Sequence, residues 1–246
     1  MVEFFYGNSP KHIHKGYSSP CETRCEPLLP LIIGLDILYV DSHIIVVNKP
    51  NGLLSVPGIG PDKQDCVVNR VKSLIIESID SPSVHRLDMD TSGLLVLGLT
   101  KESQRDLSIQ FMNREVTKSY IALLDGILMQ ESGEITLPFR LDTENRPYQI
   151  YDEKKGKIGT TMFKRIGVEP YKDRHATRVE FTPKTGRTHQ LRVHSAHEKG
   201  LNMPIIGDRL YGTRLEGERL MLHAATLTFI HPDTKKVMEF VTKAPF

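Results

Sequence analysis

A dense polar segment, residues 85–93, stands directly before the apolar stretch 94–99 and contains Arg86, Asp88 and Asp90. An apolar run without alternation predicts a strand covered on both faces, so the polar residues before it are held at the rim of a core. An ionised aspartate at such a rim can act as nucleophile, base or electrostatic stabiliser. A turn capped by either aspartate, with Arg86 as its ion-pair partner, explains the same residues without catalysis.

The charge of Asp88 depends on its neighbours. Desolvation drives a buried carboxyl toward its neutral form, whereas a guanidinium within a few ångströms keeps it ionised and oriented. Arg86 lies two positions from Asp88, so the two side chains share a face along an extended segment and diverge along a helix. The residues themselves indicate an Asp-centred site with basic surroundings and leave its substrate open.

Length and composition are those of an ordinary globular protein. The chain has 246 residues, of which 39% are hydrophobic and 25% charged, enough for one large domain with a substantial core. No apolar segment approaches the roughly 20 residues of a membrane helix, and residues 1–7 lack the basic and apolar parts of a signal peptide. We therefore expect a cytoplasmic protein without membrane contact.

Charge is nearly balanced over the whole chain but not locally. The net charge of +2 gives no global sign of nucleic-acid binding. Residues 164–219 carry twelve Lys and Arg against seven Asp and Glu. This local excess suits a surface that faces phosphates, although a solvated face explains it equally well.

Common cofactor and metal signatures are absent or weak. The sequence contains no phosphate-binding P-loop, dinucleotide fingerprint, nucleophile elbow or His-Glu-x-x-His motif. The three cysteines are odd in number and scattered, which argues against a secreted disulfide scaffold. Two sets of side chains could bind a metal, but a flexible tail explains the first and off-face spacing disfavours the second: His12, His14, Cys21 and Cys25; His189, His194 and His197.

Three helices are expected to position these residues. Asp65 can cap a helix whose apolar residues return as far as Ile79, and Thr100 is a good N-cap for a helix that ends near Asn113. A third helix is expected to begin at Thr188 and to end near Gly200.

Many short β-branched or apolar runs separated by turns predict strands. Residues 1–34 are predicted to be an N-terminal leader without a core of its own, and residues 35–246 one domain. Short strands mixed with few helices, without a strict βαβ rhythm, predict an α+β fold around a mixed, mainly antiparallel sheet. The expected strands are residues 37–40, 44–47, 94–99, 115–124, 134–138, 159–165, 177–181, 220–225, 227–230 and 237–241.

Ordered blocks of this sequence resemble the RluA-type pseudouridine synthases over about residues 36–246. The blocks that carry the resemblance are His85-Arg86-Leu87-Asp88-x-x-Thr91-Ser92-Gly93-Leu94-Leu95-Val96, Lys118-Ser119-Tyr120-Ile121-Ala122, Thr185-Gly186-Arg187-Thr188-His189-Gln190-Leu191-Arg192-Val193-His194, and Leu222-His223-Ala224 with His231-Pro232. The segment from Val46 to Gly58 is similar to the family's first block. Several blocks in the family's order are far more specific than any single motif.

The resemblance implies a fold and a reaction. It implies a single α+β pseudouridine-synthase domain whose sheet is flanked by helices and loops and whose cleft binds RNA. The reaction breaks the N-glycosidic bond of a uridine, rotates the uracil and joins its C5 to the ribose, without metal or cofactor. Asp88 is implied as the essential nucleophile or base, and which of the two it is stays open.

The resemblance also implies roles for other residues. Tyr120 matches an active-site aromatic that stacks on the uracil, and Arg192 matches the basic residue that pairs with Asp88. Leu222 is implied as part of the uracil pocket. Taken without the family, Tyr120 and Leu222 are equally explained as ordinary core residues.

Four residues are expected to contact RNA. Arg86 matches the residue that fills the space left by the flipped base and stacks on neighbouring bases. Arg187 is expected to bind a phosphate at the start of a helix. His85 and Lys118 complete the RNA-binding set, and His85 and Asp90 are also expected to support the loop.

About 35 residues precede the first expected catalytic strand, too few for the S4-type domain that many relatives carry. This short form resembles family members that recognise compact hairpins, and residues 137–147 are reminiscent of that subgroup. The expected partners are therefore a tRNA anticodon stem-loop, a hairpin of large-subunit ribosomal RNA, or both. The enzyme is expected to be a monomer.

Two other functions compete with this one. A catalytically inactive RNA-binding or ribosome-assembly protein could use the same cleft, but such a protein has no need of an ionised carboxylate facing RNA phosphates. An Asp-dependent glycoside hydrolase is disfavoured because no motif places a second carboxylate.

Overall fold

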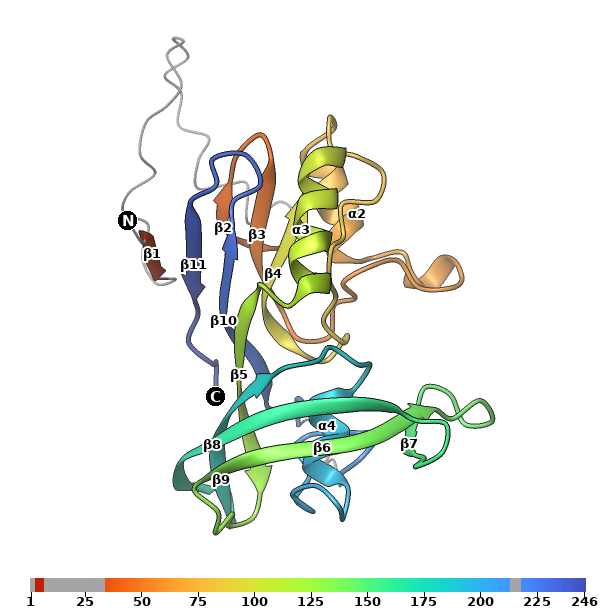
Figure 1. The fold of residues 1–246 in the computed structure, drawn as a ribbon, viewed down its shortest axis with the longest axis vertical. Coiled ribbons are helices and arrows are strands. Elements are labelled where there is room, and N and C mark those ends of the chain that lie inside the picture. The colour runs from red at the N-terminus through yellow and green to blue at the C-terminus, as the bar shows by residue number, and fades with distance from the viewer. Residues whose placement is uncertain (1–2, 7–33, 213–217) are drawn as a thin grey trace.

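The computed structural model describes residues 3–6, 34–212 and 218–246 (Figure 1). Its helices are the 3-10 turn η1 (Pro61–Lys63), α2 (Val67–Leu74), α3 (Lys101–Asn113) and α4 (Gln190–Ala196). Its strands are β1 (Glu3–Tyr6), β2 (Asp36–Val40), β3 (Ile44–Lys49), β4 (Ser92–Gly98), β5 (Thr117–Asp125), β6 (Ser132–Leu141), β7 (Gln149–Tyr151), β8 (Lys157–Tyr171), β9 (Arg174–Pro183), β10 (Leu222–Ile230) and β11 (Val237–Val241).

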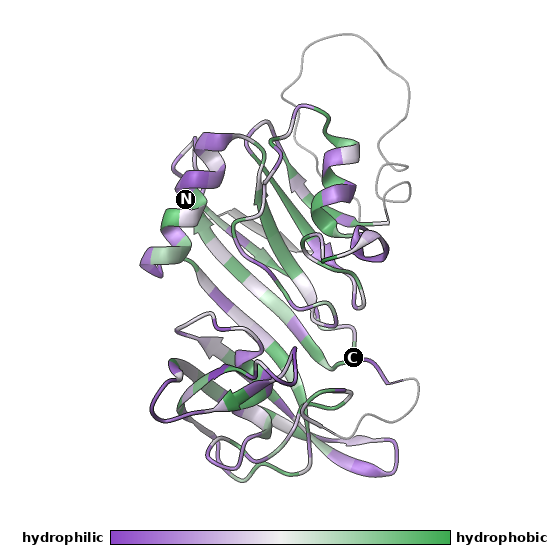
Figure 2. Ribbon diagram, turned by 90° about the vertical axis from the view of Figure 1, so that its right-hand side faces the viewer, coloured by the Kyte–Doolittle hydropathy of each residue, from purple (hydrophilic) through white to green (hydrophobic). Residues whose placement is uncertain are grey.

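Strand β4, which holds the apolar stretch, is buried along its whole length. Leu94 and Val96 pack into one core with Leu107 of α3, whereas Leu95 and Leu97 pack into a second, larger core together with α2. Figure 2 shows a helix on each side of these strands. The expectation of a strand covered on both faces is confirmed, and the polar segment before it lies where the two halves of the molecule meet.

The described strands form one sheet in the order β2-β3-β4-β10-β5-β9-β8-β6-β7, with β11 joined to β10 and β1 to β11. Only the pairs β4·β10 and β1·β11 are parallel. The predicted α+β class with a mixed, mainly antiparallel sheet is confirmed. Strands β5 and β10 connect the upper half, which carries α2 and α3, to the lower half, which carries α4 (Figure 1).

Gly93 makes the contact between β4 and β10 possible. Its φ is 114°, and a Cβ at this position would lie 2.3 Å from the carbonyl oxygen of Ala224. A residue with a side chain cannot take this place without moving β10. The end of the polar segment is therefore tied closely to the block that begins at Leu222.

Two predicted helix starts are wrong. Asp65 does not cap α2, because its carboxylate pairs with Arg70, and the Cys66 thiol accepts from Asn69 N instead. Thr188 does not cap α4 either. That helix begins at Gln190 after a left-handed His189, and the Gln190 side chain itself accepts from Arg187 N.

Several boundaries also differ. Helix α2 ends at Leu74 rather than near Ile79, and α4 ends at Ala196 rather than near Gly200. The two strands expected in residues 220–230 are one strand, β10, with an irregularity between Ala224 and Thr226. The helix expected between Thr100 and Asn113 is confirmed, since the Thr100 hydroxyl accepts from Ser103 N.

The leader is described only in part. Residues 3–6 form β1 and pair with β11. The leader side chains named as a possible zinc site, His12, His14, Cys21 and Cys25, lie outside the described residues. Within the described part of the chain, no helix is long and apolar enough to cross a membrane.

Candidate active site

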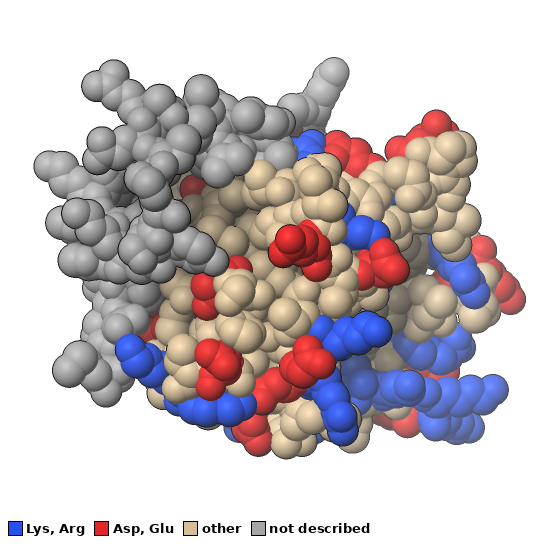
Figure 3. Space-filling model, turned by 90° about the horizontal axis from the view of Figure 1, so that it is seen from above, with Lys and Arg blue, Asp and Glu red and all other residues tan. Residues whose placement is uncertain are grey.

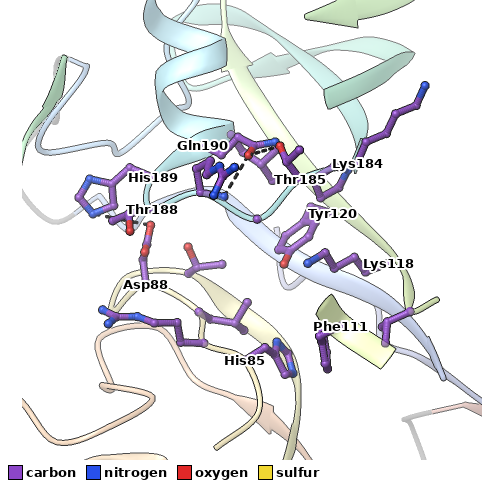
Figure 4. A pocket seen from close by; sticks show the side chains of 18 of the residues that line it. His85, Asp88, Phe111, Lys118, Tyr120, Lys184, Thr185, Thr188, His189 and Gln190 are labelled. Carbon is purple, nitrogen blue, oxygen red and sulfur yellow. Dashed lines mark hydrogen bonds and ion pairs between the residues drawn. The ribbon is translucent and has the colours of Figure 1, made fainter. Parts of the chain in front are cut away.

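A cleft of about 860 Å³ lies between the polar segment, the end of α3, the start of β5 and residues 182–192. Figure 4 shows its side chains converging from these elements. All eight residues named from the sequence line it: Asp88, Tyr120, Arg192, Arg86, Arg187, His85, Lys118 and Leu222. The structure thus brings the predicted site together, while the role of each residue stays a prediction.

The carboxylate of Asp88 lies at the inner end of the polar segment, with 21% of its side chain exposed. Its Oδ2 is 3.6 Å from Arg192 Nη1 and 3.9 Å from His189 Nε2. Leu87 is buried between Arg86 and Asp88, and both neighbours line the cleft, as expected for an extended segment. Asp88 is therefore a partly exposed carboxylate with cationic and imidazole neighbours on one side.

Arg192 forms the predicted ion pair with Asp88, but it pairs more closely with Asp208, which was not expected. Its Nε and Nη2 form a two-pronged ion pair with Asp208, at 2.8 and 2.6 Å. Both side chains are buried, with 4% and 1% exposed. Burial lowers the pKa of Arg192, but the bonds to Asp208 outweigh it and raise the pKa overall. Only Nη1 of Arg192 is left to face Asp88.

Tyr120 is buried at the centre of β5 and projects into the cleft (Figure 4). Burial, helped by the charge of Asp88, raises the pKa of its hydroxyl above the ordinary value. The phenol therefore stays protonated and can donate a hydrogen bond at neutral pH. A protonated donor beside a carboxylate can hold a polar group of a flat substrate.

Lys118 enters the cleft from the same strand. Within the described chain no carboxylate forms an ion pair with Lys118, and its Nζ lies 5.5 Å from the Phe111 ring centre. Burial lowers the pKa of Lys118. A desolvated ammonium without a carboxylate is suited to bind an anion.

The His85 side chain is held by contacts within the protein and is not free to bind RNA. Its Nε2 accepts from Val96 N at 3.1 Å, and its ring stacks on Phe111 with centres 4.4 Å apart. Burial lowers the pKa of His85 to about 3, so the ring is neutral. This geometry favours the supporting role over a contact with RNA.

The remaining predicted residues lie at the rim and the floor. Arg86 and Arg187 are exposed, and Leu222 is buried at the start of β10. Arg187 lies three residues before the seven-residue α4 and donates to Ile158 O at 3.4 Å. The expected placement of Arg187 at a helix N-terminus is therefore wrong, although its guanidinium does reach the cleft.

Hydrogen bonds from residues 49–55 hold the backbone of the polar segment. The buried Lys49 ammonium donates to Met89 O at 2.9 Å, and the Ser55 hydroxyl both accepts from Leu87 N and donates to Leu87 O. Asn51 donates to Asp90 O. These bonds fix the residues on both sides of Asp88, so its position is set before a substrate arrives.

Lys49, Asp208 and Tyr211 are site residues that sequence reasoning did not single out, and His189 was considered only as a possible metal ligand. Lys49 stood inside a recognised block, but nothing local marks its burial. Asp208 lies sixteen positions after Arg192, and only the fold brings them together. Within the described residues, no group of three or more His, Cys, Asp or Glu side chains could hold a metal ion, and this includes the histidines of α4.

The arrangement can support acid–base or nucleophilic chemistry on an anionic substrate. The lining residues include six cations and one carboxylate, Asp88. Two of these cations, Lys184 and Arg192, form ion pairs, whereas the other four carry none within the described chain: Arg86, Arg114, Lys118 and Arg187. A single reactive carboxylate inside a basic cleft suits a polyanion with one reacting unit.

Comparison with known proteins gives this geometry a context. The family model described as RNA pseudouridylate synthase matches residues 43–197. The dual-specificity RNA pseudouridine synthase RluA of Haemophilus ducreyi is 45% identical over 223 residues, 88% of this chain and 96% of the relative. The dual-specificity RNA pseudouridine synthase RluA of Escherichia coli K12 is 43% identical over 215 residues, 86% of this chain and 94% of the relative. The structure of human RNA Pseudouridylate Synthase Domain Containing 1 matches with a TM-score of 0.70 and 29% identity, covering 86% of this chain and 84% of that one.

Proposed function

The chain belongs to the RNA pseudouridylate synthase family, and we propose that it isomerises specific uridines of a structured RNA with Asp88 as its catalytic group. The observation that carries the proposal is the single carboxylate in a cleft lined by six cations. RNA supplies the phosphates for those cations, and the flipped uridine supplies the one reacting unit.

In this proposal the reaction exchanges one bond for another at the ribose. The bond between N1 and C1′ breaks, the uracil turns while it is held, and C5 bonds to C1′. The proton lost from C5 is balanced by the one gained at N1, so no oxidant, metal or cofactor is required. Asp88 either attacks the ribose or removes a proton from it after the bond breaks.

The neighbours of Asp88 have separate tasks. Tyr120 stacks on the uracil and, as a protonated phenol, donates to a polar group near the ribose. Leu222 contributes an apolar wall. Arg192 holds Oδ2 of Asp88 in place through its third nitrogen, Nη1, at 3.6 Å.

RNA recognition is assigned to the cations of the rim. Arg86 fills the space that the flipped base leaves and offsets part of the unstacking cost of about a few kcal/mol. Lys118 and Arg187 bind phosphates on the two sides of the cleft. In Figure 3, Lys and Arg side chains gather at the lower right of the view.

The proposed substrates are a tRNA anticodon stem-loop, a large-subunit ribosomal RNA hairpin, or both. Two of the compared relatives carry the description dual-specificity, and they are 45% and 43% identical to this chain. We also propose that the enzyme acts as a monomer. An RNA substrate of this kind also supports action in the cytoplasm.

An RNA-binding protein without catalysis is the less favoured function. A binder gains nothing from a carboxylate that faces phosphates, because like charges weaken its affinity. The intact set of Asp88, Tyr120 and Arg192 at one end of the cleft favours the enzyme.

The proposal is tested by mapping pseudouridines in tRNA and ribosomal RNA from cells with and without the gene. We expect at least one pseudouridine in a hairpin loop to disappear on deletion and to return when the wild-type gene is restored. Identical maps from the two strains would contradict the proposal.

A further inference from the structure

His189 and Tyr211 form a linked pair beside Asp88 that the proposed reaction has not yet used. His189 Nδ1 lies 2.8 Å from the Tyr211 hydroxyl, and His189 Nε2 lies 3.9 Å from Asp88 Oδ2. The imidazole is nearly buried, with 9% of its side chain exposed. Figure 4 shows His189 at the side of the cleft next to Asp88.

The hydrogen bonds of Tyr211 determine which nitrogen of His189 carries the proton. The Tyr211 oxygen accepts from Gln149 N at 2.8 Å, so its single hydrogen is available for His189 Nδ1. Burial lowers the pKa of His189 although the charge of Asp88 acts in the opposite direction, and the ring is neutral. A neutral imidazole that accepts at Nδ1 carries its hydrogen on Nε2, the atom nearest Asp88.

We propose that His189, oriented by Tyr211, is a positioning residue that donates from Nε2 to Oδ2 of Asp88 when RNA is bound. Arg192 Nη1 approaches the same oxygen, at 3.6 Å. With Oδ2 held from two directions, Oδ1 is the oxygen that meets the ribose. The inference rests on the proposed function, since it concerns the carboxylate that carries the reaction.

The distance of 3.9 Å is too long for a hydrogen bond in the free protein. Catalytic hydrogen bonds are often long without substrate and tighten in the complex. A shift of about one ångström in the Asp88 side chain closes the gap. Bound RNA therefore completes the contact that the free protein prepares.

The turn formed by residues 208–211 contacts both groups that face Asp88, the Arg192 guanidinium and the His189 imidazole. Asp208 binds Arg192 through its carboxylate, and it also accepts from Tyr211 N at 3.1 Å. The Tyr211 ring lies 5.3 Å below the Arg192 guanidinium, while its hydroxyl holds His189. Arg192 uses two of its nitrogens to bind Asp208 and has only one left for Asp88. His189 can therefore add a hydrogen bond to Asp88 that Arg192 does not supply.

The backbone conformation of His189 allows the donor role to be distinguished from a purely structural role. His189 has φ 56° and ψ 18°, the left-handed region that asparagine adopts more readily than glutamine. The nitrogen of a glutamine amide matches the position of Nε2, whereas that of asparagine matches Nδ1. A backbone role therefore predicts that His189→Asn is the better variant, and the donor role predicts that His189→Gln is.

The test uses total RNA from a strain that lacks the gene, with the full-length protein in excess over RNA. Single-turnover rate constants and RNA affinities are measured for wild type, Tyr211→Phe, His189→Asn and His189→Gln. Tyr148→Phe is the matched control. The Tyr148 ring packs edge-on against the Tyr211 ring, with centres 5.9 Å apart, but the Tyr211 hydroxyl bonds to Gln149 N and His189 Nδ1 and not to the Tyr148 hydroxyl. Circular dichroism verifies folding.

We expect Tyr211→Phe and His189→Asn to lose about 10- to 100-fold in rate, the equivalent of one hydrogen bond to a charged group. RNA affinity stays unchanged, His189→Gln retains most of the rate, and Tyr148→Phe matches wild type. The inference is overturned if His189→Asn exceeds His189→Gln or if Tyr211→Phe matches wild type. If the His189→Gln protein does not fold, the rates of Tyr211→Phe and His189→Asn still test the inference.

The same experiment distinguishes failure of the proposed function from failure of the inference about His189 and Tyr211. A wild-type protein that forms no pseudouridine in this RNA contradicts the proposed function itself. An active wild type whose variants rank in the wrong order contradicts only the role of His189 and Tyr211.

Discussion

At the scale of single residues, Arg192 divides its guanidinium between two carboxylates. Its fork binds Asp208, which is 1% exposed, and its remaining nitrogen faces Asp88 at 3.6 Å. Removing one partner of a buried ion pair leaves an uncompensated charge, which costs much more than the pair contributes as a whole. The shape of the guanidinium is therefore as important here as its charge.

The substitution Arg192→Lys tests this geometry. Lysine keeps the charge but cannot form the fork to Asp208 and also reach Asp88, so we expect the single-turnover rate to fall about 10- to 100-fold. Arg165→Lys is a matched control, because Arg165 faces Glu131 outside the cleft. An Arg192→Lys protein with the parental rate would show that the pairing is not needed.

At the scale of elements, residues 49–55 form a cradle for the catalytic segment. The Lys49 ammonium is fully buried and donates to three carbonyl oxygens, those of Pro50, Leu53 and Met89. Burial lowers the pKa of Lys49 to about 7, with the charges of Asp90 and Asp88 acting in the opposite direction. The end of β3 and the segment around Asp88 are therefore joined by one titratable group.

Comparison of wild type with Lys49→Met tests this junction. Between pH 7 and about 10.5 the unfolded chain holds a proton on Lys49 that the folded chain has released. The stability of wild type relative to Lys49→Met should therefore rise with pH in this window, by at most about 1.4 kcal/mol per pH unit. Urea unfolding at pH 7 and pH 9 measures the difference, and a constant difference would mean that Lys49 stays charged in the fold.

Helix α4 carries a second buried titratable group. Both ring nitrogens of His194 are buried without a hydrogen-bond partner within the described residues, and burial lowers its pKa to about 4. Below pH 6.5 the unfolded chain protonates this histidine while the folded chain does not, so stability falls as the pH drops toward 4.

We expect His194→Leu to flatten this acid loss by about 1.4 kcal/mol per pH unit. The free energy of unfolding at pH 7, 6 and 5 measures the slope. His175→Leu is the control, because it makes the same replacement at an exposed position on β9. An unchanged slope in His194→Leu would indicate that the histidine is charged in the folded state.

At the scale of the whole molecule, the sheet brings together residues that are distant in the sequence. Local patterns predicted β4 and α3. An uninterrupted apolar run indicates a strand buried on both faces, and Thr100 directly before α3 indicates a helix cap, so neighbouring residues suffice for both predictions. The continuity of β10 was missed, because distant neighbours hold its two parts in one strand, β4 beside its start and β11 beside its end. Elements whose form depends on distant partners are not visible in local sequence.

The candidate site follows the same division. The residues that line the cleft could be named because they stand in ordered blocks that resemble a family. Asp208 and Tyr211 could not be named, since their roles depend on contacts with Arg192 and His189 made only in the fold. The predicted cap at Thr188 failed because the helix begins only at Gln190, after the left-handed His189.

The central claim is that the Asp88 carboxylate carries out the reaction in a cleft that binds RNA. Asp88→Asn keeps the size of the side chain and an acceptor for Arg192, but the amide is neither a nucleophile nor a base at neutral pH. Single-turnover pseudouridine formation, measured together with RNA affinity and thermal unfolding, tests the claim most directly. We predict a folded protein that binds RNA and forms no pseudouridine, whereas formation at the wild-type rate would contradict the account.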